Sequence, residues 1–194
     1  MNNFWNNAAK WGLLIGIIMG SSRILEYGLM LSGEVRNFAL LTIEWVVVAV
    51  LYVILLYQVA KNRAVQIYDT VGFSFGQSLN YAMIVSMFAS VIVAAMTYVY
   101  INSVVGGYSI FIRAFTESAI KVLSETGVEG GIMDMYTDTL TRIDSEGVVE
   151  PTIFTTLLST LSTYILAGIA AGAAVSLVVK SKIKKIFNSG QNEQ

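Results

Sequence analysis

KWGLLIGIIMGSSRILEYGLML, residues Lys10–Leu31, is long and apolar enough to cross a membrane as one helix. The apolar core of a bilayer is about 30 Å thick, so a helix that rises about 1.5 Å per residue needs about 20 mostly apolar residues to span it. Three more stretches meet that length, and the links between them do not: Asn37–Tyr57, Ser78–Asn102 and Thr152–Val179. The sequence therefore predicts four transmembrane helices.

The composition agrees with this prediction. Hydrophobic residues make up 55% of the chain, charged residues 13%, and the mean hydropathy is +0.66, whereas soluble domains carry about 25% charged residues. The alternative is a soluble protein with four buried helices, which would have very little polar sequence to cover them. We therefore expect an all-α, polytopic membrane bundle that forms one domain over residues 1–194.

Several kinds of chemistry are excluded by residue content. The chain has no cysteine and no histidine, which removes thiol nucleophiles, thiolate zinc sites and imidazole bases. An intramembrane enzyme would depend on carboxylates, but no aspartate dyad lies in a span. The outer carboxylates Asp134 and Asp138 lack an ordered ligand loop. We expect no enzymatic activity, no cofactor and no metal site.

Lysine and arginine predict the orientation. If the N-terminus is cytoplasmic, seven basic residues lie on the inner side and four on the outer side, as the positive-inside rule requires. Both termini are then cytoplasmic, and the first span is an uncleaved helix. The basic tail, residues 180–194, begins with four lysines that either fix the topology or rest on anionic lipid headgroups.

Glycines recur every four residues in the first span, at Gly12, Gly16 and Gly20. At 100° per residue they form one stripe that lets another helix approach closely. Arg23 and Tyr27 continue the same arc, with Glu26 at its edge. We therefore expect Arg23 to face protein and not lipid.

An arginine inside a span needs a partner, because a charge is costly in hydrocarbon. Counted at 1.5 Å per residue from the outer end, Glu26 lies about 8 Å deep, Glu44 of the second span about 10 Å and Arg23 about 13 Å. The sequence predicts that Arg23 lies between the two carboxylates. Their excess negative charge makes either one a candidate for proton or cation handling; the alternative is that the cluster only fastens the two helices together.

The fourth span has two faces. Gly168 and Gly172 predict helix packing on one face, while hydroxyls crowd the other. The hydroxyl face either joins Tyr27 in a polar cleft or bonds to its own helix and faces lipid. The candidate cleft residues are Tyr27, Thr156, Ser159, Thr160 and Thr163.

The outer link, residues 103–150, is predicted to form an extracytoplasmic amphipathic helical hairpin, broken at Gly127 and at Gly130-Gly131. It holds eight acidic and three basic residues, a net charge of −5, so we expect no nucleic-acid binding. Its apolar stripe is expected to pack on the bundle or on a partner.

Several stretches resemble the small four-helix bacterial membrane proteins catalogued as domain-of-unknown-function family 4199. The resemblance lies in Lys10–Tyr27, Leu41-Thr-Ile-Glu-Trp45 and Gly72–Tyr81, together with the order of the spans and the long outer link. It implies an inner-membrane location and carries no activity with it.

The expected function is that of an accessory or scaffold membrane protein that packs on itself or on a membrane partner, with membrane lipids around it. The alternative is a small transporter, or a helper in proton-coupled or lipid-linked substrate movement, that uses Arg23, Glu26 and Glu44. Four spans without an internal repeat are few for a complete transporter.

Overall fold

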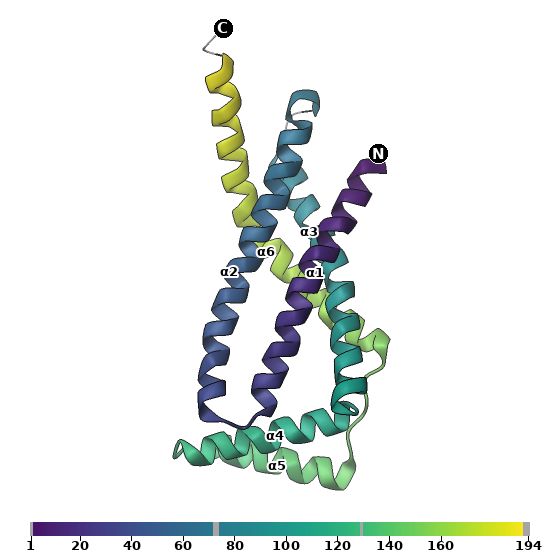
Figure 1. Ribbon diagram of the computed structural model, residues 1–194, viewed down its shortest axis with the longest axis vertical. Helices are drawn as coiled ribbons and strands as arrows, with labels where there is room; N and C mark the ends of the chain where they lie inside the picture. Colours follow the sequence, from purple (N-terminus) through teal and green to yellow (C-terminus); the bar gives the residue numbers. More distant parts are fainter. Residues whose placement is uncertain (1, 72–73, 129, 192–194) are drawn as a thin grey trace. The chain divides into compact units, whose positions relative to one another are not determined.

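The computed structural model describes residues 2–71, 74–128 and 130–191, with side chains described for residues 4–66, 74–128 and 130–181. This part of the chain is almost entirely helical and contains no strand. In chain order the elements (Figure 1) are α1 (Asn2–Leu31), α2 (Val35–Val71), α3 (Phe75–Val99), the π-helical turn η1 (Tyr100–Val105), α4 (Tyr108–Glu125), α5 (Gly131–Glu146) and α6 (Ile153–Gln191).

Four helices are long and apolar enough to cross a membrane: α1, α2, α3 with its continuation η1, and α6. The predicted all-helical class and the four candidate spans are confirmed. Two helices are longer than the predicted spans: α2 continues past the predicted span to Val71, and α6 continues to Gln191. Polar residues such as Lys and Gln end an apolar stretch, but they are good helix formers and do not end the helix.

Glycines with positive φ close the helix ends. Gly33, between α1 and α2, has φ +62°, and Gly106 and Gly107, between η1 and α4, have φ +102° and +133°. Side chains with a Cβ rarely adopt these values. The turn at Gly33 is short, because α1 ends at Leu31 and α2 begins at Val35.

The helices contribute to two compact units, each described by itself. The first unit contains residues 1–19, 49–92 and 158–194, and the second contains residues 20–48 and 93–157. The first has a core of fully buried aliphatic side chains, which includes Ile15, Leu56, Val85 and Val179. That α1–α6 form one membrane domain stays a prediction.

In the second unit, α4 packs against the turn that joins α1 and α2 (Figure 1). Ser118 Oγ donates a hydrogen bond to the carbonyl oxygen of Leu31 at 3.2 Å. Phe111, Ala119 and Val122 of α4 are buried in this unit. The predicted apolar stripe of the outer link is therefore partly covered within the chain.

Helices α4 and α5 lie side by side, as the sequence predicts for the outer link (Figure 1). The rings of Phe115 and Tyr136 lie 6.4 Å apart, and Arg113 Nη1 lies 2.9 Å from Asp144 Oδ1. A hydrogen bond to Glu117 and the nearby charge of Asp144 raise the pKa of Arg113 above its usual value. The side of the membrane on which this pair lies stays a prediction.

Candidate functional site

A cluster of polar side chains joins α1 to α2 in the second unit. We call it the polar cluster, and its members are Ser22, Arg23, Glu26, Tyr27, Glu44 and Trp45. Its most buried member is Glu26, which is only 5% exposed. Arg23 Nη1 donates to Glu26 Oε2 at 2.6 Å, and Trp45 Nε1 donates to Glu26 Oε1 at 3.1 Å. Both carboxylate oxygens of Glu26 thus have donors, one from each helix.

Arg23 has its partners on its own helix. Its guanidinium carbon lies 5.3 Å from the centre of the Tyr27 ring, one turn further along α1. The Arg23 side chain is 47% exposed, although we expected it to face protein. The reason is that Glu26 and Tyr27 satisfy the guanidinium within α1, so that it needs no second helix.

Glu44 is held differently. Its Oε1 accepts a hydrogen bond from Ser22 Oγ, while its Oε2 is buried and has no hydrogen-bond partner in the part of the chain that the structure describes. A buried carboxylate oxygen without a donor is unfavourable unless a proton or another group reaches it. Glu44 is therefore the least satisfied ionisable group of the polar cluster.

The structure corrects the predicted arrangement of charges. We expected Arg23 to lie between Glu26 and Glu44, but among the described residues it forms an ion pair only with Glu26. Successive residues of a helix point about 100° apart. Because Ser22 faces Glu44 on α2, the next residue is turned away from that helix.

Sequence reasoning missed two members of the polar cluster, Ser22 and Trp45. The tryptophan fits an interfacial belt by residue type but lies deep for that role in the second span. An indole N–H within an apolar span needs an acceptor, and a carboxylate at a similar predicted depth on the neighbouring helix was the available signal. Ser22 carried no comparable signal, because a serine in a span can bond to its own helix.

Tyr27 lies among aromatic rings of the second unit. Its ring centre is 4.8 Å from that of Phe111 on α4 and 6.2 Å from that of Tyr100 in η1. On α6, Thr163 donates to the carbonyl oxygen of Ser159 at 3.0 Å, which is the self-bonded arrangement of the hydroxyl face. The cleft of Tyr27, Thr156, Ser159, Thr160 and Thr163 stays a prediction.

The predicted packing glycines of α1 lie against α3. A Cβ built on Gly16 would lie 2.7 Å from Ile92 Cβ and 2.8 Å from the carbonyl oxygen of Ala89. Gly12 faces Phe88 in the same way within the first unit, and within the second unit Gly20 faces Met96. The stripe thus serves packing inside this chain.

The packing glycines of α6 also meet α3, within the first unit. A Cβ on Gly168 would lie 2.5 Å from Ser86 Oγ, and one on Gly172 would lie 3.0 Å from Ala82 Cβ. Ser86 donates to the carbonyl oxygen of Ala82 at 2.8 Å. Since that uses its one proton, the 2.7 Å hydrogen bond between Tyr52 and Ser86 must have the tyrosine as donor.

These contacts describe a helical protein of the membrane type and do not point to a particular reaction. The chain is helical, with four helices that suit a membrane, an Arg–Glu pair within α1 and small residues between helices. Among the described residues no group of three His, Cys, Asp or Glu could hold a metal ion. A comparison of the chain with protein-family models, with curated proteins and with solved structures found no match.

Proposed function

We propose that this chain is a non-enzymatic accessory or scaffold protein of the bacterial inner membrane that associates with itself. The observation that carries the proposal is the hydrogen bonding of Glu26, whose two carboxylate oxygens accept hydrogen bonds from Arg23 and Trp45. A buried carboxylate with fixed donors from two helices acts as a fastener, because moving either donor leaves a charge unpaired. The resemblance to family 4199 supports the bacterial inner membrane.

Self-association is supported by the outward face of α2 in the second unit. Ile43, Val46 and Val47 are each more than half exposed. In hydrocarbon such a face packs against lipid or against another helix by van der Waals contact. The chain has no cysteine, so a disulfide in the Val47→Cys variant can form only between two copies of the chain. Cross-linking of this variant in membranes therefore tests whether two copies meet through this face of α2.

Leu166→Cys is the matched control, because Leu166 is exposed on α6. We expect a cross-linked dimer with Val47→Cys and none with Leu166→Cys. Equal yields would mean random collision, and no dimer with Val47→Cys would contradict self-association through this face.

The proposed topology has both termini in the cytoplasm. The first unit has seven basic and two acidic residues, a net charge of +5, and the second has five basic and eleven acidic residues, a net charge of −6. This asymmetry supports an inner location for the basic ends of the spans. Single cysteines at Ser124 and Ser189 test it with an impermeant thiol reagent on intact spheroplasts. Labelling at Ser189 without labelling at Ser124 would overturn the topology.

The second candidate function is help in moving a proton-coupled or lipid-linked substrate. Glu44 favours it, because its buried Oε2 has no partner in the described part of the chain, and such carboxylates bind protons or cations in transporters. Proton flux into liposomes that contain the purified protein separates the two functions. A scaffold gives no flux above empty liposomes, whereas a proton carrier gives a flux that Glu44→Gln abolishes.

A further inference from the structure

Two serines are buried without hydrogen-bond partners in the first unit. Ser78 of α3 and Ser176 of α6 are both 0% exposed. Neither side-chain oxygen has a hydrogen-bond partner in the part of the chain that the structure describes. The great majority of buried polar groups in proteins are hydrogen-bonded, either to protein or to ordered water. Two unpartnered hydroxyls in one compact unit therefore point to a bound group.

The two serines belong to facing rows of small residues. Residues four apart form a row along a helix, and such rows of α6 and α3 meet in opposite directions. A Cβ on Gly168 would lie 2.8 Å from Ser86 Cβ, and one on Gly172 would lie 3.0 Å from Ala82 Cβ. The next step of four along each row leads to the two serines. The register therefore places them at the same level of the contact between α3 and α6.

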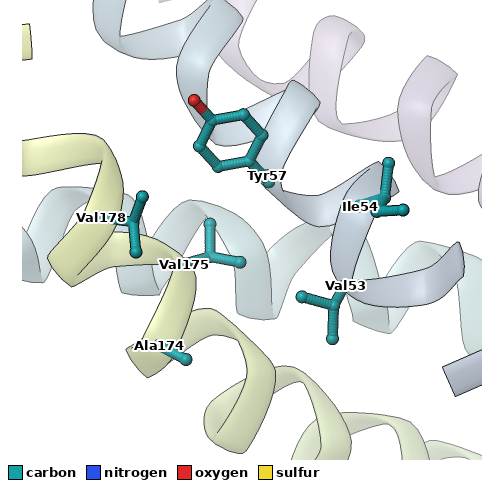
Figure 2. A pocket seen from close by; sticks show the side chains of 6 residues that line it. All are labelled: Val53, Ile54, Tyr57, Ala174, Val175 and Val178. Carbon is teal, nitrogen blue, oxygen red and sulfur yellow. The ribbon is translucent and has the colours of Figure 1, made fainter. Parts of the chain in front are cut away.

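Ser176 lies on the face of α6 that meets α3. An apolar groove lies between α2 and α6, and Figure 2 shows Ala174, Val175 and Val178 on its α6 wall. Ser176 is not among the residues that line this groove. Because successive residues of a helix point about 100° apart, Ser176 lies about 150° around α6 from the middle of that wall. It shares the opposite face with Gly172, one turn earlier.

Other buried serines of α3 bond to their own helix, which is a common arrangement for serine. Ser86 donates to the carbonyl oxygen of Ala82 at 2.8 Å, and Ser90 donates to that of Met87 at 2.7 Å. The hydroxyls of Ser78 and Ser176 make no such bond in the described part of the chain. They are therefore able to bind a group between the two helices.

We infer that a water molecule binds between α3 and α6 and links the hydroxyls of Ser78 and Ser176. Water suits the site because it both donates and accepts hydrogen bonds, as a serine hydroxyl does. Buried waters typically bind polar groups that otherwise have no partner. A hard cation suits it less, because such ions prefer carboxylate oxygens and neither facing row contains a carboxylate. The inference goes beyond the proposed scaffold function and does not depend on it.

The proposed site is close to one end of both helices. Ser78 is the fourth residue of α3, which begins at Phe75, and Ser176 comes four residues before Lys180 on α6. At about 1.5 Å per residue, each serine lies about 5–6 Å along its helix from those positions. Water can therefore enter from the end of the helices without a polar path through the apolar core.

The test is NMR spectroscopy of the full-length protein in deuterated detergent, where cross-peaks between water and backbone amide protons report bound water. We expect such cross-peaks at the amides of Ser78 and Ser176. A serine hydroxyl that exchanges its proton with water gives a similar signal, so variants decide its origin. Ser78→Ala should remove the cross-peak at Ser176, and Ser176→Ala should remove that at Ser78, because a shared water needs both hydroxyls. Ser90→Ala is the control and should leave both cross-peaks in place.

Thermal unfolding tests the same link. Ser78→Ala and Ser176→Ala should be coupled, so that the double variant lowers the melting temperature by less than the sum of the two single losses. Ser90→Ala combined with Ser176→Ala is the matched control, because Ser90 bonds within its own helix. The losses of this second pair should add.

The inference is overturned by any of three results. They are the absence of a water cross-peak at both serines, a cross-peak at Ser176 that persists in Ser78→Ala, and additive losses of melting temperature for that pair. Coupled losses without a water cross-peak would also overturn it, because the serines would then bond directly to each other. The cross-peaks of the unmodified protein test the site even if a variant does not fold.

Discussion

The indole N–H of Trp45 on α2 donates to Oε1 of Glu26 on α1 at 3.1 Å. Each group satisfies the other, because an indole N–H away from water needs a hydrogen-bond acceptor and a buried carboxylate needs hydrogen-bond donors. Since Arg23 occupies the other oxygen of Glu26, this carboxylate ties an ion pair within α1 to a hydrogen bond between helices.

Trp45→Phe should lower the free energy of unfolding by about 0.6 kcal/mol and by no more than about 1.7 kcal/mol, the average and the largest value that double-mutant cycles give for hydrogen bonds between membrane helices. The ring is kept, and only the donor to Glu26 is lost. Unfolding in mild detergent gives the difference. Trp5→Phe is the control, because Trp5 is 55% exposed and Trp45 is 53% exposed. An equal effect of the two changes would contradict a role for the Trp45–Glu26 bond.

Double-mutant cycles should separate the charges of the polar cluster. Arg23→Leu and Glu26→Gln should be coupled, because the two side chains form a hydrogen-bonded ion pair. Arg23→Leu and Glu44→Gln should be additive within about 0.5 kcal/mol, as for sites that share no partner. Unfolding free energies of the single and double variants check both statements. Coupling of Arg23 to Glu44 would restore the bridged arrangement expected from helix depth.

Ser22→Ala should destabilise the protein by about 1–3 kcal/mol, because it leaves Glu44 without its hydrogen-bond donor. Glu44→Gln in the same chain should recover part of that loss, since an uncharged side chain is cheaper to leave unpaired. Ser21→Ala is the control, at an exposed position of the same turn. Thermal unfolding in detergent measures all three variants. If Ser21→Ala costs as much as Ser22→Ala, the Ser22–Glu44 contact is not what stabilises the helices.

Gly16→Ala should destabilise the protein by about 1–3 kcal/mol, because the added methyl meets Ile92 and the backbone of Ala89. Gly28→Ala, on the same helix, is the matched control, because a Cβ there meets nothing within 4 Å. It should be neutral or stabilise by up to about 1 kcal/mol, since alanine favours a helix. Folded yield and unfolding in detergent compare the two. Similar losses at both positions would show that contact with α3 does not set the effect.

Part of the fold follows from the sequence because its signals are local. An apolar run of about 20 residues predicts a candidate span wherever it stands, and Gly33, Gly127 and Gly130 mark turns by their freedom at positive φ. The ends of α2 and α6 were not predictable in the same way. An apolar run reports where hydrocarbon ends, whereas Val71 and Gln191 mark how far the helix continues past it.

The sequence by itself determined the helical class, the four candidate spans and the positions of Arg23, Glu26 and Glu44 along their helices, because each depends only on residue type and on a rise of about 1.5 Å per residue. The choice of partners among these side chains was decided by the tertiary structure. Which side of α1 meets α2 depends on how both helices pack, and a turn of 100° exchanges Arg23 for Ser22 as the neighbour of Glu44. The same packing brings Trp45 to Glu26.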